Sequence, residues 1–179
     1  MTTHEERVRQ SFSRQAFMSN LGAELTAVVQ GGVEIRLPFS SNLTQQNGYL
    51  HAGAITAVLD SACGYAALTV AADDKDVLTV EFKVNLLAPA AGEIFAARAQ
   101  VKRAGRTLTV CTADAFAISN GREKVVATMA TIMAVPRTAA KWRGIEPRGC
   151  FVSAVARFRQ LVDREELIRI LLPPIIIEK

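Results

Sequence analysis

A single carboxylate in a long apolar run places the strongest constraint on how this chain can fold. Residues 52–72 read AGAITAVLDSACGYAALTVAA, and Asp60 is the only charged residue among them. The alanines and leucines favour a helix, and so apolar a helix is expected to be buried. A lone buried carboxylate is costly unless it is satisfied or used. We therefore expect the chemistry at Asp60 and at the polar residues before the helix, which are Gln45, Asn47, Gly48 and His51.

Length and composition bound the possible classes. The chain has 179 residues, half of them hydrophobic, which predicts one main domain with a real core. We place that domain at 1–136 and interpret 137–179 as a basic linker followed by a C-terminal helix. The net charge of +4 is too small to indicate nucleic-acid binding. The three cysteines are widely spaced without a CxxC pair, so neither a zinc site nor a disulfide framework is predicted, and we expect no metal.

The first twenty residues carry several charges and lack an apolar segment, so no signal peptide is expected. The run 52–72 is long enough to cross a bilayer, but the position of Asp60 at its middle argues against a membrane span. We therefore expect a soluble cytoplasmic protein.

The pattern of the remaining chain predicts an α+β fold with one long helix and about six strands. Residues 4–18 are typical of a short N-terminal helix, and 23–38 of a hairpin with its turn at Gly31-Gly32. Apolar and polar residues alternate over 77–87, and three more strands are expected at 93–103, 106–118 and 123–135. Short turns between successive strands imply that sequence neighbours pair antiparallel.

The start of the long helix predicts a site for developing negative charge. If the helix begins at Ala52, its first N–H groups lack intrahelical partners and lie at the positive end of the helix dipole. They could stabilise an oxyanion, with His51 and Gln45 beside them. Asp60 lies eight residues further on, about 12 Å along the axis. One ester group cannot touch both Ala52 and Asp60 across that distance. The spacing therefore suggests a homodimer in which two helices lie antiparallel and share two equal sites.

Candidate roles follow from residue chemistry. Asp60 could be a general base on water or the nucleophile itself. His51 is more easily explained by a local structural role than by proton transfer, and Thr79 could hold the water or be a plain strand residue. The basic loop 102–107 could bind phosphates or be an ordinary solvated turn. We expect the acyl pocket to be lined by Leu59, Tyr65 and Leu68.

Three segments carry a resemblance to a known family. QQNGYLHAGAITAVLDSACGYAA, LTVEFKVNLLAPAAGE and RAGRTLTV together resemble the hotdog-fold acyl-CoA thioesterases. Within them the chain is most similar to the phenylacetate-degradation type, which is related to the arthrobacterial 4-hydroxybenzoyl-CoA thioesterases. The resemblance covers roughly 15–136. Its motif is a His-small-Gly step at His51, a carboxylate nine residues later, and the strand end Asn85-x-x-x-Pro89.

The resemblance implies a long helix wrapped by an antiparallel sheet, and homodimers that pair into homotetramers. It implies hydrolysis of a small or medium acyl- or aryl-CoA, with no metal and no cofactor, because CoA is part of the substrate. In this family the base or nucleophile corresponds to Asp60, and the N–H that polarises the carbonyl to Ala52. The second carbonyl ligand corresponds to Gln45 or to Asn47, and the residue that holds the water to Thr79.

The resemblance also assigns contacts with CoA, which fall on Arg103, Gly105, Arg106, Thr107 and Asn85. Where some members carry a hydroxyl four residues after the carboxylate, this chain has Gly64. The segment after 137 matches nothing in the family.

Two other functions stay open from sequence. A hotdog hydratase or dehydratase would use His51 with Asp60 of another chain as an acid–base pair. A non-catalytic acyl-CoA sensor would bind the thioester without cleaving it. The acyl group is not readable from the residues.

Overall fold

The computed structural model describes residues 3–135. The linker and helix predicted for 137–179 lie outside the described residues.

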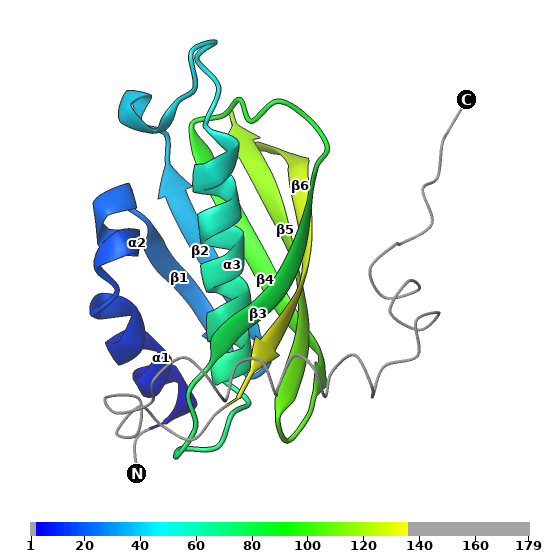
Figure 1. The fold of residues 1–179 in the computed structure, drawn as a ribbon. Coiled ribbons are helices and arrows are strands. Elements are labelled where there is room, and N and C mark those ends of the chain that lie inside the picture. Colours follow the sequence, from blue (N-terminus) through cyan, green and yellow to red (C-terminus); the bar gives the residue numbers. More distant parts are fainter. Residues whose placement is uncertain (1–2, 136–179) are drawn as a thin grey trace, which may run out of the picture. The chain divides into compact units, whose positions relative to one another are not determined.

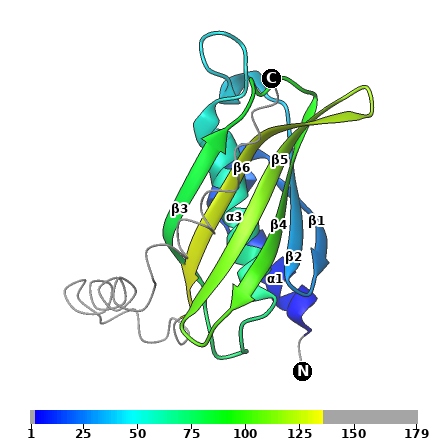
Figure 2. The same cartoon turned by 90° about the vertical axis from the view of Figure 1, so that its right-hand side faces the viewer.

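One long helix packs against a six-stranded antiparallel sheet (Figures 1 and 2). The spatial order of the strands is β1-β2-β4-β5-β6-β3. The α+β hotdog arrangement expected from sequence is therefore confirmed. The elements are α1 (His4–Ser13), α2 (Ala16–Leu21), β1 (Glu24–Val29), β2 (Gly32–Pro38), the 3-10 turn η1 (Ser41–Leu43), α3 (Ala52–Leu68), β3 (Leu78–Leu86), β4 (Ile94–Ala104), β5 (Leu108–Ser119) and β6 (Arg122–Ala134).

The pairing of β3 corrects the sequence-based expectation. β3 pairs with β6 and not with β4, the next strand along the chain. The segment between them passes the start of α3, where the N–H of Leu50 donates to the carbonyl of Ala90 at 3.1 Å. The chain then enters the middle of the sheet as β4, between β2 and β5. As a result β3 is an edge strand, and its outer edge has no partner within the described residues.

Small side chains bring α3 close to the sheet. Ala62 and Ala66 of the helix are fully buried, and alanines of β4 and β5 are buried with them in one core. Leu59, Phe95 and Ile35 are among the largest fully buried side chains. Since a side chain of one carbon holds its neighbour at a shorter distance than a branched one, the sheet can curl around the helix.

Two helix boundaries differ from the predicted ones. The helix expected over 4–18 breaks at Arg14, and Gln15 adopts an extended backbone before α2. The helix expected over 52–72 ends at Leu68. The hydroxyl of Thr69 donates to the carbonyl of Ala66 and accepts from the N–H of Gly31, both at 2.7 Å. At the end of α3 a contact with the β1–β2 turn thus accompanies the stop.

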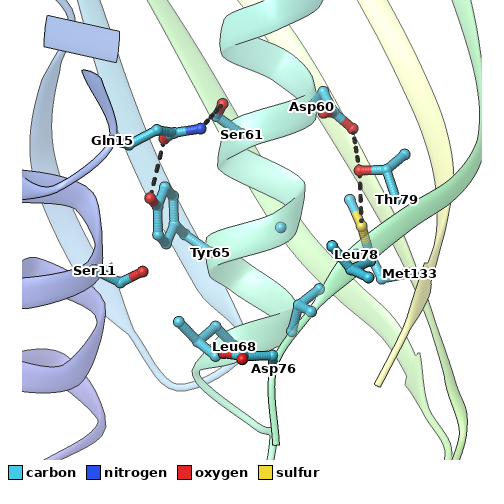
Figure 3. A pocket seen from close by; sticks show the side chains of 12 residues that line it. Ser11, Gln15, Asp60, Ser61, Tyr65, Leu68, Asp76, Leu78, Thr79 and Met133 are labelled. Carbon is cyan, nitrogen blue, oxygen red and sulfur yellow. Dashed lines mark hydrogen bonds between the residues drawn. The ribbon is translucent and has the colours of Figure 1, made fainter. Parts of the chain in front are cut away.

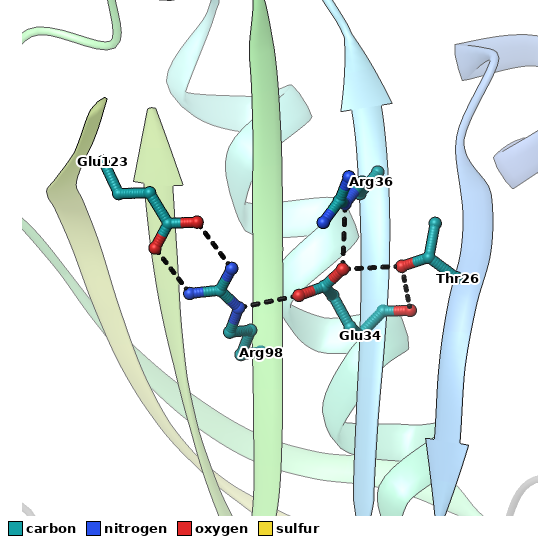
Figure 4. A network of polar contacts seen from close by, with 5 residues as sticks. All are labelled: Thr26, Glu34, Arg36, Arg98 and Glu123. Atoms are coloured by element: carbon teal, nitrogen blue, oxygen red, sulfur yellow. Dashed lines mark hydrogen bonds and ion pairs between the residues drawn. The ribbon is translucent and has the colours of Figure 1, made fainter. Parts of the chain in front are cut away.

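The face of the sheet away from α3 carries a charged network (Figure 4). The guanidinium of Arg98 donates to Glu34 at 2.7 Å and, through two N–H groups, to Glu123 at 2.7 Å. The same guanidinium lies 4.6 Å from the ring centre of Phe116. These contacts link β2, β4, β5 and β6 on the side opposite the candidate site.

Candidate active site

Asp60 and Thr79 meet in the space between α3 and β3 (Figure 3). The hydroxyl of Thr79 lies 2.8 Å from Oδ1 of Asp60 and donates to it. It also lies 3.4 Å from the sulfur of Met133. The structure therefore brings the two residues together through a hydrogen bond from the threonine hydroxyl to the carboxylate.

A β-bulge accounts for the inward position of Thr79. The pairing of β3 with β6 shifts between Thr79 and Glu81, which leaves one extra residue on β3. Thr79, opposite the buried Met133, consequently lies on the same face as Phe82 and Val84, although strict alternation would put it on the other face. The regular alternation expected over 77–87 is wrong at this end of the strand.

The carboxylate of Asp60 opens into a cavity of about 230 Å³. The lining residues are Ser11, Gln15, Asp60, Ser61, Gly64, Tyr65, Leu68, Asp76, Val77, Leu78, Thr79 and Met133. Of the three residues expected at an acyl pocket, Tyr65 and Leu68 line this cavity, and Leu59 is fully buried in the core.

Burial raises the pKa of Asp60 above its ordinary value, and the hydrogen bond from Thr79 acts in the opposite direction. Burial penalises the charged form, while a donor to the carboxylate favours it. The group is thereby made more basic than a solvated aspartate. A more basic carboxylate is a better acceptor of a proton from water.

The N-terminus of α3 has the form that the sequence predicts. His51 is the N-cap, and its Nδ1 accepts the N–H of Gly53 at 2.9 Å. This is the kind of local role expected for it. The carbonyl of His51 accepts from Ala54 and Ile55. The N–H of Ala52 has no acceptor among the described residues and is therefore available to a ligand.

A second cavity, of about 250 Å³, lies at this end of the helix. Gln45, Ala52 and Leu86 are among the residues that line it, and Asn47 is not. The side-chain oxygen of Gln45 accepts from the N–H of Asn47, which fixes the turn that both occupy. Gln45 is half-buried and Asn47 exposed. The placement favours Gln45 over Asn47 as a neighbour of a group bound at Ala52.

The candidate residues of one chain therefore fall into two cavities at different levels of α3. Asp60 and Thr79 line the first, while Gln45 and Ala52 line the second. Asp60 lies eight residues beyond Ala52, so the two levels differ by about 12 Å along the axis.

The residues assigned to CoA contacts do not all come together in one chain. Arg103, Gly105, Arg106 and Thr107 lie exposed at the turn between β4 and β5. A Cβ on Gly105 would lie 2.6 Å from the carbonyl oxygen of Leu108, so only glycine fits this turn.

Asn85 lies elsewhere. It is opposite Thr128 on β6, whereas the β4–β5 turn is at the level of Ala134. Six residues of strand separate the two levels, about 20 Å. Within one chain Asn85 is therefore remote from the loop of the two arginines.

The sequence missed the contribution of Gln15. Its side chain reaches α3 from the break between α1 and α2, accepts from the hydroxyl of Tyr65 at 3.0 Å and donates to that of Ser61 at 3.4 Å. Gln15 also lines the cavity of Asp60. No local signal marks this residue, since a glutamine is an ordinary helix former.

Residues 3–135 show neither a metal-binding cluster nor a membrane-spanning helix. No group of three His, Cys, Asp or Glu side chains there is arranged to hold a metal ion. No helix in that part of the chain is long and apolar enough to cross a membrane.

Comparisons with known proteins define the class. The model of the thioesterase superfamily matches residues 47–124, which include Ala52, Asp60 and Thr79 but not Gln45. A thioesterase family protein from Silicibacter pomeroyi is 50% identical, and the match covers 75% of this chain and 99% of that one with a TM-score of 0.74. The chain belongs to the thioesterase superfamily.

More distant relatives are consistent with this class. A candidate esterase of Saccharolobus solfataricus is 33% identical over 90 residues, which are 50% of this chain and 64% of that protein. The PaaI protein of the Escherichia coli phenylacetic acid degradation operon shares the fold at 17% identity, with a TM-score of 0.66 over 76% of this chain and 94% of that one.

Proposed function

We propose that the protein is an acyl-CoA thioesterase that hydrolyses the thioester of a small or medium acyl or aryl group to the free acid and CoA. The observation that carries the proposal is Asp60, a half-buried carboxylate of raised pKa that is held by Thr79 and opens into a cavity. Membership of the superfamily supports it. We assign the chain to the phenylacetate-degradation type on the motif of His51, Asp60, Asn85 and Pro89.

The chemistry divides between the middle of α3, where Asp60 lies, and its N-terminus. Asp60 removes a proton from water, or attacks the thioester carbonyl directly, and Thr79 keeps the carboxylate aligned. The N–H of Ala52, at the positive end of the helix, donates to the carbonyl oxygen as it gains charge. Gln45 is placed to donate a second hydrogen bond through its amide. In the first route hydroxide adds to the carbonyl carbon, the C–S bond breaks, and the proton held by Asp60 passes to the CoA thiolate. In the second route the C–S bond breaks to leave a mixed anhydride on Asp60, which water then hydrolyses.

Because these groups line separate cavities, the proposal requires two copies of the chain. The edge strand β3 supplies a surface for pairing, since Phe82 is 45% and Leu86 57% exposed on it. An unpaired apolar edge is a template for another strand. Antiparallel pairing of two β3 strands reverses the second α3 relative to the first. Asp60 of one copy then lies toward Ala52 of its partner, and two equal sites result. Such dimers could pair further into tetramers.

The exposed arginines of the β4–β5 turn, Arg103 and Arg106, are proposed to bind the phosphates of CoA. Guanidinium groups form charge-assisted hydrogen bonds with phosphate oxygens. Gly105 permits the tight turn that holds them.

Thiol release from a panel of acyl-CoAs tests the function. The proposal predicts release from at least one of the short, medium or aryl members, and loss of that release in Asp60→Ala. Saturable binding without release would instead indicate an acyl-CoA sensor. Loss of enoyl absorbance without release would indicate a hydratase, which the use of Nδ1 of His51 as a helix cap does not favour.

A further inference from the structure

The cavity at Asp60 continues across the outer face of α3 to Gln15, and one glycine makes that continuity possible. Residues four apart on a helix lie above one another, so Asp60, Gly64 and Leu68 form one row. Ser61 and Tyr65 form the adjacent row. All five line the same cavity. Gly64 lies where any other residue would project a side chain into the space between Asp60 and Tyr65.

Nothing in the packing of residues 3–135 requires a glycine at this position. Gly64 lies inside α3, away from both ends, and its backbone φ is not positive. A Cβ there would meet only the terminal methyl of Met133, at 4.0 Å, an ordinary contact. Glycine in a helix interior lowers helix stability relative to alanine. The fold alone would therefore favour alanine, and the open space above Gly64 points to a ligand.

The far end of this space is polar. The hydroxyl of Tyr65 donates to Gln15 at 3.0 Å, and the amide of Gln15 donates to Ser61 at 3.4 Å. Figure 3 shows this group on one side of α3, with Asp60 and Thr79 on the other. Burial raises the pKa of Tyr65, while Ser11 and the charge of Arg14 act in the opposite direction. A primary amide has two donors and two acceptor sites, and these contacts use one of each.

We propose, on the basis of the thioesterase function above, that this groove is the acyl-binding channel and that Gly64 determines how large an acyl group it accepts. The acyl chain runs from Asp60 over Gly64 and ends at Gln15 and Tyr65. The matching class is an acyl group of medium length with a hydrogen-bonding group, such as a hydroxyl, at its far end. Gln15 is a specificity-determining residue at that end.

The test measures binding of non-hydrolysable ketone analogues of acetyl-CoA, hexanoyl-CoA and omega-hydroxyhexanoyl-CoA by titration calorimetry. Gly64→Val is expected to weaken binding of the hexanoyl analogue about tenfold more than that of the acetyl analogue, with Gly64→Ala between it and wild type. Gln15→Ala is expected to weaken the hydroxylated analogue about fivefold relative to the unsubstituted one. Gln10→Ala, an exposed glutamine of α1 outside the cavity, is the matched control and should leave the ratio unchanged.

Thermal melting guards against misfolding, and Gly64→Ala is expected to melt no lower than wild type. The proposal is overturned if the Gly64 variants weaken the binding of all analogues by the same factor. It is also overturned if Gln15→Ala weakens the binding of the two hexanoyl analogues equally. Thiol release from the natural thioesters is measured in parallel on wild type. Its absence would contradict the thioesterase function, while the binding ratios would still decide the role of the groove.

Discussion

At the scale of single residues, the proposed catalysis depends on the environment of Asp60. Burial makes its carboxylate more basic, and Thr79 keeps it oriented. The same burial makes the charge a cost to the fold, so function and stability oppose one another at this position.

Asp60→Asn separates these two effects. We expect thiol release to fall by about 10²- to 10⁴-fold, the usual worth of a general base. Because the pKa of Asp60 is raised in the folded state, its contribution to stability is complete below pH 3.8 and is lost as the pH rises through the folded pKa. The variant should therefore match wild type in acid and be at least as stable at pH 7. Urea unfolding at several pH values, with thiol release alongside, measures both; an Asn variant that is less stable only at neutral pH would contradict the assignment.

Thr79→Val removes the donor that lowers the pKa of Asp60. The acid limb of the kcat/KM profile should lie above pH 3.8 in wild type and move to higher pH in this variant, because the carboxylate loses stabilisation of its charged form. Thr79→Ser keeps the hydroxyl and serves as the control. If the valine variant kept the wild-type profile, the hydrogen bond would have no part in catalysis.

At the scale of elements, contacts between helices and loops position the site. The guanidinium of Arg7 on α1 donates to the carbonyls of Ala71 and Ala72 at 3.1 and 3.0 Å, and to that of Lys75. These bonds tie α1 to the segment that leads from α3 into β3. The segment ends at the Asp60 cavity, so α1 supports the site from a distance.

Arg7→Ala should lower the free energy of unfolding by about 1.5–3 kcal/mol, the usual worth of hydrogen bonds from a charged group. Arg9→Ala on the same helix removes an exposed pair with Glu5 and a long contact, 3.4 Å, with the carbonyl of Leu25, and should cost less than Arg7→Ala, about 0.5 kcal/mol. Chemical denaturation of the two variants makes the comparison. Equal losses would mean that the three carbonyl contacts of Arg7 add no more to the free energy of unfolding than the exposed contacts of Arg9.

Local sequence patterns predict several of the elements but not all of the contacts between them. A run rich in alanine and leucine predicts the long helix, and the short turn between the strands expected at 106–118 and 123–135 predicts an antiparallel pair; both are confirmed. The pairing of β3 with β6 and the position of Gln15 were not predicted. Both depend on contacts between segments distant in sequence, which no local pattern encodes. Asp60 was found because a charge is conspicuous in an apolar run.

At the scale of the whole molecule, the apolar edge of β3 is the proposed contact between copies. Phe82→Lys places a charge on that edge and is expected to convert the dimer into monomers and abolish most thiol release, although Asp60 is unchanged. Val29→Lys is the matched control, because Val29 is 65% exposed on the opposite edge strand β1. Sedimentation velocity measures the mass. An active Phe82→Lys monomer would contradict a shared site.

In the proposed dimer, Asp60 of one copy acts on a carbonyl held at Ala52 and Gln45 of the other. The direct measurement is thiol release after Asp60→Asn and Gln45→Ala chains, each inactive alone, are unfolded together and refolded. In a mixed dimer one of the two sites has both functional residues, so an equal mixture should recover about a quarter of wild-type activity. Activity no higher than the mean of the two separate variants would show that each site lies within a single chain.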